Sequence, residues 1–155
     1  MSVARAARVM LGRDWCGDVI NNMPVLGKLA SESGSLDVRV FLRDQHPDLM
    51  DQYLNQGQYK SIPVIAFFDD DFRELGRWIE RPASVTARRE ERRREIYAEH
   101  PEFGAPDAPI DQLPGDARTT LAGLVADMRE ELMPFSNREM IRELREIVER
   151  DATSA

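Results

Sequence analysis

Residues 63–68, PVIAFF, form an unbroken apolar run in the middle of the chain. A strand with one face in water alternates apolar and polar residues, so a run without alternation is typical of a strand that fills the centre of a sheet. Such a strand must be covered on both faces by other parts of the chain. The segments on either side of the run therefore decide which fold is available.

These segments switch between the period of a strand and the period of a helix. Residues 7–11 predict a short strand, residues 17–34 an amphipathic helix that ends at Gly34, and residues 36–42 a strand with one buried face. The apolar positions of the helix and of the second strand are Val19, Ile20, Met23, Leu26, Leu29 and Ala30, followed by Leu36, Val38, Val40 and Leu42.

Residues 46–58 predict a second helix, which stops at Gly57 before the central strand. The acidic turn at residues 69–71 then joins that strand to an antiparallel neighbour over residues 72–79, and Pro82 opens a long charged helix. The predicted order is β-α-β-α-β-β-α. This is an α/β fold with a helical extension after it.

The only cysteine of the chain, Cys16, lies where the first strand passes into the first helix, in the sequence Asp14-Trp15-Cys16-Gly17-Asp18-Val19. Pro24 lies in the middle of the following helix, and Ile62-Pro63 precedes the central strand. This element order and these positions resemble the thioredoxin family, whose motif is usually Trp-Cys-Gly-x-Cys. The likeness is strongest to bacterial thioredoxin-like proteins with Trp-Cys-Gly-Asp-Cys.

The resemblance covers residues 6–81 and implies a thioredoxin-like fold, in which Pro63 is a cis proline that faces the cysteine. It also implies that Cys16 is the reactive thiol and that Trp15, Gly17, Asp18, Ile62 and Pro63 contact the substrate. Two features depart from the family. Val19 stands at the position of the second, resolving cysteine, and the βα unit that precedes this core in full-length thioredoxins has no counterpart.

The chemistry of Cys16 can also be argued without the family. A cysteine at a helix N-terminus lies among unpaired backbone N–H groups and at the positive end of the helix dipole, both of which stabilise a thiolate. Asp14 and Asp18 oppose this effect, because a nearby carboxylate disfavours a second negative charge. Pro63 has no N–H, so the backbone beside it is free to pair with an extended peptide.

Two functions are consistent with a single thiol at this position. The first is thiol-disulfide exchange, or formation of a mixed disulfide, by Cys16 in an oxidoreductase that lacks the resolving cysteine. It requires no bound cofactor, but it needs glutathione or another low-molecular-weight thiol, or a second protein's cysteine, to complete the reaction. The alternative is a redox-inactive binding or adaptor module, in which the sulfur is incidental and Val19 only fills space.

Composition excludes several other classes of function. The net charge of −7 argues against a nucleic-acid partner, because phosphate binding depends on Lys and Arg. No apolar run approaches the roughly 20 residues that span a bilayer, and no secretory signal is recognisable, so we expect a cytoplasmic protein without a membrane partner. Its expected partner is a protein or a small thiol or disulfide.

Other polar groups give weaker signals. His46 and His100 are far apart and no second ligand stands near either, so we expect no metal site. The aspartates at residues 69–71 lack the spacing of a calcium loop and are expected in a solvated turn. The arginines between residues 88 and 94 alternate with glutamates, which is typical of a solvated helix held by its own ion pairs.

The sequence predicts three regions: a core over residues 1–100, a linker over 101–116 and a helical extension over 117–150. Pro134 is expected to divide the extension into two helices. Their apolar stripes must be buried, either on the core or in a homodimer. The residues expected to be buried are Leu121, Leu124, Val125, Ile141, Leu144 and Val148.

Overall fold

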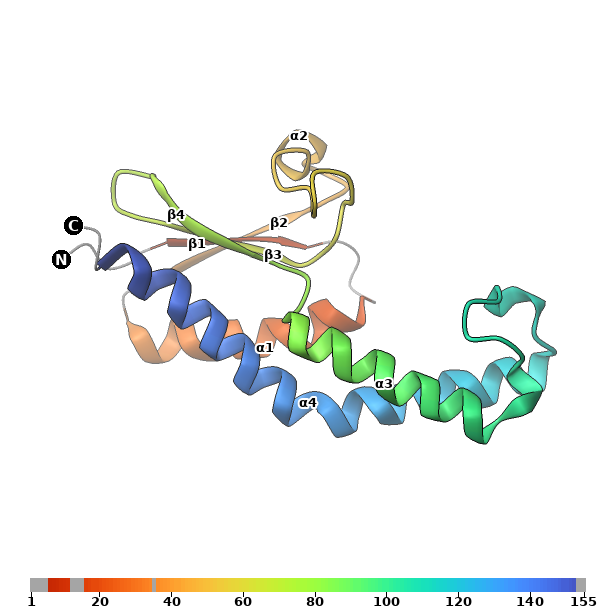
Figure 1. The fold of residues 1–155 in the computed structure, drawn as a ribbon. Helices are drawn as coiled ribbons and strands as arrows, with labels where there is room; N and C mark the ends of the chain where they lie inside the picture. The colour runs from red at the N-terminus through yellow and green to blue at the C-terminus, as the bar shows by residue number, and fades with distance from the viewer. Residues whose placement is uncertain (1–5, 12–15, 35, 153–155) are drawn as a thin grey trace. The chain divides into compact units, whose positions relative to one another are not determined.

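The structure is a computed structural model that describes residues 6–11, 16–34 and 36–152 of the 155-residue chain. Its elements follow the predicted order, with a long fourth helix at the end (Figure 1). In chain order they are β1 (Ala6–Leu11), α1 (Gly17–Ser33), β2 (Asp37–Leu42), α2 (Pro47–Met50), β3 (Val64–Phe68), β4 (Glu74–Ile79), α3 (Ala83–Glu99), η1 (Pro101–Phe103), η2 (Ile110–Gln112) and α4 (Gly115–Ala152).

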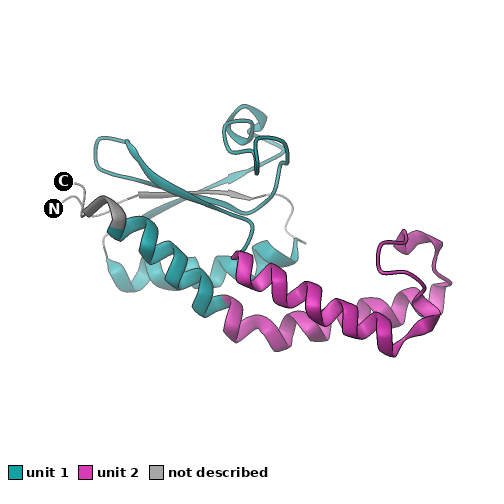
Figure 2. Ribbon diagram, in the orientation of Figure 1, with its two compact units in different colours: residues 1–81, 137–155 teal, residues 82–136 magenta. Residues whose placement is uncertain are grey.

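Two compact units divide the chain: residues 1–81 with 137–155, and residues 82–136 (Figure 2). The first unit contains the sheet, α1, α2 and the last part of α4. The second contains α3, both short 3-10 helices and the first part of α4. The predicted region boundaries at residues 100 and 116 both fall inside this second unit.

The four strands form one sheet in the order β2-β1-β3-β4. β1 pairs with β2 in parallel, which the helical crossover α1 permits, and with β3 antiparallel. β3 and β4 form the predicted antiparallel hairpin, with a register shift at Phe67/Phe68. Asp69 closes its turn, since its carboxylate accepts the N–H groups of Asp71 and Arg73 at 2.9 and 2.8 Å.

All five residues of β3 are buried, as the apolar run predicts. Because alternate side chains point to opposite faces, the strand supplies two separate clusters. Ile65 and Phe67 pack in one cluster with Leu26 of α1 and with α4. Val64, Ala66 and Phe68 pack in the other, with Met50 at the end of α2 and with Tyr53. Figure 1 shows α1 and α2 on opposite faces of the sheet.

The end of α4 is part of the first cluster. Met140, Leu144 and Ile147 are buried there, and the indole N–H of Trp78 donates to Glu143 at 2.7 Å. In the second unit, Leu121 and Met128 of α4 are buried against α3 and η1. The other residues expected to be buried, Leu124, Val125, Ile141 and Val148, are half-buried. Homodimer formation stays a prediction.

Three expectations are wrong in detail. α4 is one helix with Pro134 inside it, where two helices were expected. α2 ends at Met50, and turns continue to residue 59, although Met50 and Tyr53 are buried as expected. Ile20, Val40 and Leu42 are exposed: Ile20 lies in the first turns of α1, and the other two lie on β2, an edge strand.

Gly76 of β4 provides a test of this packing. A Cβ atom at this position would lie 2.7 Å from Cγ2 of Ile147, which is buried in the first cluster. We therefore expect Gly76→Ala to lower the free energy of unfolding by about 1–3 kcal/mol. Gly27 in α1 has no atom within 4 Å of such a Cβ, so Gly27→Ala should raise it by about 0.5–1 kcal/mol. Urea titration measures both, and equal effects would contradict the close approach.

Candidate functional site

Cys16 is the N-cap residue of α1, as the sequence predicts. Its backbone is extended (φ −70°, ψ 117°), and its carbonyl accepts the N–H of Ile20 at 3.0 Å, which is the first hydrogen bond of the helix. The side chain is half-buried and makes no capping hydrogen bond to α1. The sulfur therefore lies at the end of a 17-residue helix whose first N–H groups have no partner within the helix.

Val19 follows one turn later and is only 6% exposed. Its side chain fills the protein interior at the position where the resemblance places a resolving cysteine. Cys16 is the only sulfhydryl in the chain, so an internal disulfide cannot form.

Asp18 lies between these two residues and forms an ion pair with Arg81. The guanidinium Nη1 donates to the Asp18 carboxylate at 3.0 Å, and the two side chains are 22% and 11% exposed. The first turn of a helix favours an acidic residue, because the dipole is positive there. The sequence did not predict that Arg81 pairs with Asp18, and the same guanidinium also pairs with Glu80.

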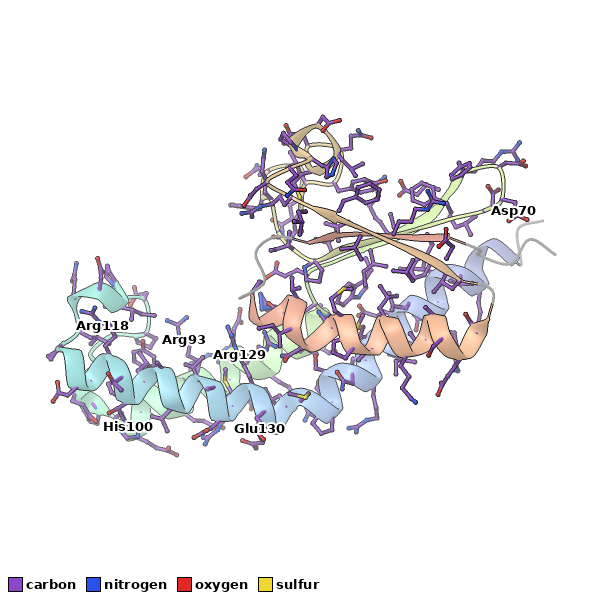
Figure 3. All side chains as sticks on the ribbon, turned by 180° about the vertical axis from the view of Figure 1, so that it is seen from behind. Asp70, Arg93, His100, Arg118, Arg129 and Glu130 are labelled. Carbon is purple, nitrogen blue, oxygen red and sulfur yellow. The ribbon has the colours of Figure 1, made fainter. Side chains whose placement is uncertain are left out.

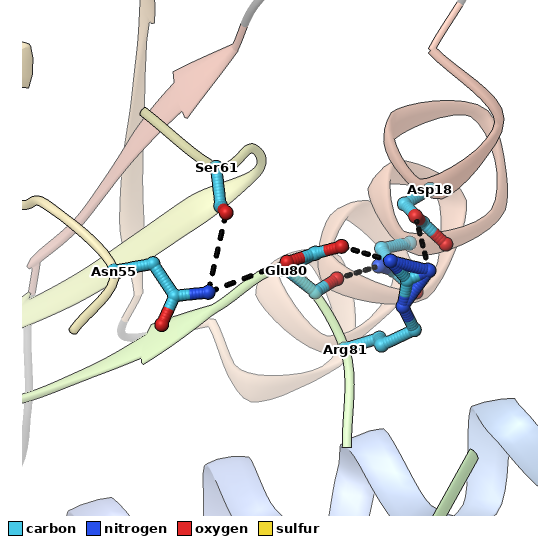
Figure 4. Close-up of polar contacts among 6 residues, drawn as sticks. Asp18, Asn55, Ser61, Glu80 and Arg81 are labelled. Carbon is cyan, nitrogen blue, oxygen red and sulfur yellow. Dashed lines mark hydrogen bonds and ion pairs between the residues drawn. The ribbon is translucent and has the colours of Figure 1, made fainter. Parts of the chain in front are cut away.

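Glu80, beside Arg81, extends this contact to the loop before β3 (Figure 4). Its carboxylate accepts hydrogen bonds from Arg81 and, at 3.3 Å, from the Asn55 amide, which also donates to Ser61 at 3.2 Å. Its backbone N–H donates to the Pro63 carbonyl at 2.7 Å, and its own carbonyl accepts from Asn22 of α1 at 3.2 Å. The φ of 66° at Glu80 turns the chain so that both backbone groups reach these partners.

This network brings several predicted site residues together. Asp18 on α1 is connected through Arg81 and Glu80 to Pro63, which is buried, and the Ile62–Pro63 peptide bond is cis. Gly17 is the first residue of α1, and Pro24 lies inside the same helix. Trp15 and Asp14 lie outside the described residues.

Sequence reasoning missed the residues that join these segments: Asn22, Asn55, Ser61, Glu80 and Arg81. Each is an ordinary polar residue in the sequence, and none belongs to a recognisable motif. The one available signal was Glu80-Arg81 at the end of a predicted strand, directly before Pro82, where charged side chains can fold back over the sheet.

The other polar groups that the sequence analysis considered lie in turns or make local contacts. Asp70 lies in the turn between β3 and β4 (Figure 3). In the second unit, the His100 ring stacks on Phe103 at 4.9 Å, and its hydrogen bond to Glu102 holds the pKa of that carboxyl below its usual range. Within the described residues, no three His, Cys, Asp or Glu side chains are grouped as metal ligands, and no helix is long and apolar enough to cross a membrane.

The arginines of α3 pair largely within the second unit. Arg92 binds Glu95 at 2.9 Å, one helical turn away, as the charge pattern predicts. Arg88 lies over the ring of Phe135 at 4.1 Å, and Arg93 donates to the carbonyl of Pro106 at 2.6 Å.

Comparison with known proteins gives one family match. The sequence profile of a family described as Thioredoxin matches residues 3–93. Among solved structures, an HIV epitope scaffold is 24% identical, with 53% of this chain and 50% of that chain covered and a TM-score of 0.44. A Pseudomonas aeruginosa protein of unknown function is 20% identical, with 80% and 63% covered and a TM-score of 0.46. The chain spans less than two thirds of each. No curated protein matches it.

Loss of the Asp18–Arg81 ion pair is expected to have a large effect on the free energy of unfolding. Arg81→Met removes the guanidinium that pairs with the mostly buried Asp18 and with Glu80, so we expect the free energy of unfolding to fall by about 3–5 kcal/mol. Arg39→Met is the matched control, because the Arg39–Asp37 pair at 3.1 Å is exposed and its loss should change stability by less than about 1 kcal/mol. Chemical denaturation of both variants tests this, and similar values would show that the pair is not important for stability.

Proposed function

The chain belongs to the thioredoxin family, and from this premise we propose that Cys16 performs one-thiol disulfide exchange with a protein or small disulfide. The observation that carries the proposal is the placement of a half-buried cysteine at the N-terminus of α1. In general, unpaired backbone N–H groups at a helix N-terminus stabilise a negative charge placed there, and the attacking species in disulfide exchange is a thiolate. Asp18, two residues after Cys16, is held by Arg81, which also pairs with Glu80.

The proposed reaction proceeds in two steps. The Cys16 thiolate attacks one sulfur of the substrate disulfide, so a bond forms to Sγ while the substrate S–S bond breaks and its second sulfur leaves as a thiolate. A dithiol enzyme would release the substrate with its second cysteine, but Val19 has no sulfur. An external thiolate, from glutathione or a similar small thiol, therefore attacks the substrate sulfur of the mixed disulfide. A new disulfide forms between that thiol and the substrate, the bond to Sγ breaks, and Cys16 leaves as a thiolate. This small thiol, glutathione or another, would be a co-substrate and not a bound cofactor, and we propose a cytoplasmic location, where such thiols keep cysteines reduced.

The substrate would bind beside the loop that contains Ile62 and Pro63. The Pro63 carbonyl is occupied by the Glu80 N–H, and Pro63 has no N–H of its own. The Ile62 backbone makes no hydrogen bond to the main chain of any residue that the structure describes, which leaves it available to an extended peptide. We assign Gly17, Asp18 and Trp15 to the same substrate surface, as the family resemblance implies.

Reaction with oxidised glutathione tests the thiol directly. We expect the folded protein to gain one glutathione on Cys16 faster than the urea-unfolded protein does at the same pH, because only the folded chain has the helix N-terminus. Intact-mass spectrometry over time measures the adduct, and Cys16→Ser should show none. A folded protein that reacts no faster than the unfolded chain would contradict exchange.

Failure of that test would favour the second candidate, a thioredoxin-fold binding module. The observation behind it is Val19, whose buried side chain occupies the position of the second sulfur. In such a module the network around Glu80 and Arg81 would shape a binding surface, and Cys16 would be a packing residue.

The variant Val19→Cys tests whether the site has the geometry that disulfide exchange requires. With sulfurs at residues 16 and 19 we expect an internal disulfide under mild oxidation, and catalysis of insulin reduction by dithiothreitol. Asn21→Cys is the matched control, because its side chain lies on a different side of α1 from residue 19. Thiol counting and the turbidity of reduced insulin are the measurements. If Val19→Cys forms no internal disulfide, the geometry does not support thioredoxin chemistry.

A further inference from the structure

A cavity of about 340 Å³ lies within the first unit, between α1 and the last turns of α4. Its floor consists of three buried apolar side chains, Leu26, Phe67 and Leu144. Half-buried apolar residues form its walls, among them Ile141 and Val148. None of these residues belongs to the Cys16 site.

The interior is suited to an apolar ligand. An internal water needs about 2–4 polar partners, and the floor offers none. An apolar cavity of roughly 150 Å³ is already large enough to bind benzene, and small-molecule sites begin at about 300 Å³. The volume therefore fits a medium-length acyl chain, which would cover the floor and the walls.

The polar residues that line the cavity, among those the structure describes, include the cation Arg145. Its guanidinium lies 4.0 Å from the Glu149 carboxylate, which is longer than a hydrogen bond, and both side chains are 70% exposed. A guanidinium has only donors, arranged in a fork that matches a carboxylate. Ser33, which also lines the cavity, already donates its hydroxyl hydrogen to Ala30 at 3.1 Å.

We propose that this cavity binds a medium-chain fatty acid, with the acyl chain against Leu26, Phe67 and Leu144 and the carboxylate on Arg145. A ligand with an anionic head would compete with Glu149 for the guanidinium, and the long separation of that pair makes Arg145 available. The site is independent of the thiol chemistry, so it can be present whether or not Cys16 reacts.

Calorimetric titration of the full chain with decanoate, below its micelle concentration, tests the proposal. We expect saturable binding at one site per chain, with decanol binding about tenfold more weakly because it cannot form the charged hydrogen bonds. Ile141→Trp fills the cavity and should abolish binding. Arg138→Trp places the same side chain at an exposed position of α4 outside the cavity and should leave binding unchanged.

The head group is tested at Arg145. Arg145→Gln should weaken decanoate about tenfold and leave decanol unaffected, while Arg145→Lys, which keeps the charge but not the fork of donors, should give an intermediate affinity. Glu149→Gln removes the competing carboxylate and should not weaken binding. The site is overturned if decanoate shows no saturable binding, or if binding persists in Ile141→Trp. If circular dichroism shows that Ile141→Trp is unfolded, Val148→Phe takes its place. Equal affinity for decanol and decanoate overturns the role of Arg145.

Discussion

Burial of β3 on both faces is the constraint on which the first unit depends. A strand with five buried residues in succession cannot lie on a sheet that is covered on one face only, so α1 and the end of α4 occupy one side while α2 and the turns after it occupy the other. This explains why residues 137–149, far along the chain, are part of the core. Phe67 and Trp78 would lose much of their cover if the side chains of Met140, Leu144 and Ile147 were absent.

The same arrangement places the candidate site. The chain leaves the sheet at the end of β4, beside the N-terminus of α1 and the loop that leads into β3. Three backbone segments meet here, and burial would leave some of their polar groups without hydrogen bonds. An unpaired buried polar group lowers the stability of the fold. Glu80 and Arg81 supply the partners: Glu80 binds the loop through its backbone and side chain, and Arg81 binds Asp18. The position of Cys16 thus depends on residues far from it in sequence.

The sequence predicted what local pattern determines and missed what tertiary contact determines. The order of the elements along the chain, α1 and the place of Cys16 follow from periodicity and from residues 14–19, whereas the order of the strands within the sheet does not. A break in the helix was expected at Pro134, because a proline removes a helical hydrogen bond, here the one to the Glu130 carbonyl. Both residues are exposed, so water can satisfy that carbonyl, and packing on either side of Pro134 holds α4 together. Likewise, β2 alternates in sequence, but Val40 and Leu42 are exposed on an edge strand that no periodicity could identify.

Helix α1 combines two environments that follow different physical rules. At its N-terminus, Asp18 pairs with Arg81 close to Cys16, while Val19 of the same turn is buried. Its second half is apolar, with Leu26 in the cluster that α4 covers. Pro24 stands between them on the exposed side, so the backbone bond it removes is lost where water can replace it. Packing of the second half therefore fixes the helix on the sheet. The sulfur of Cys16, at the N-terminus, is not needed for that packing.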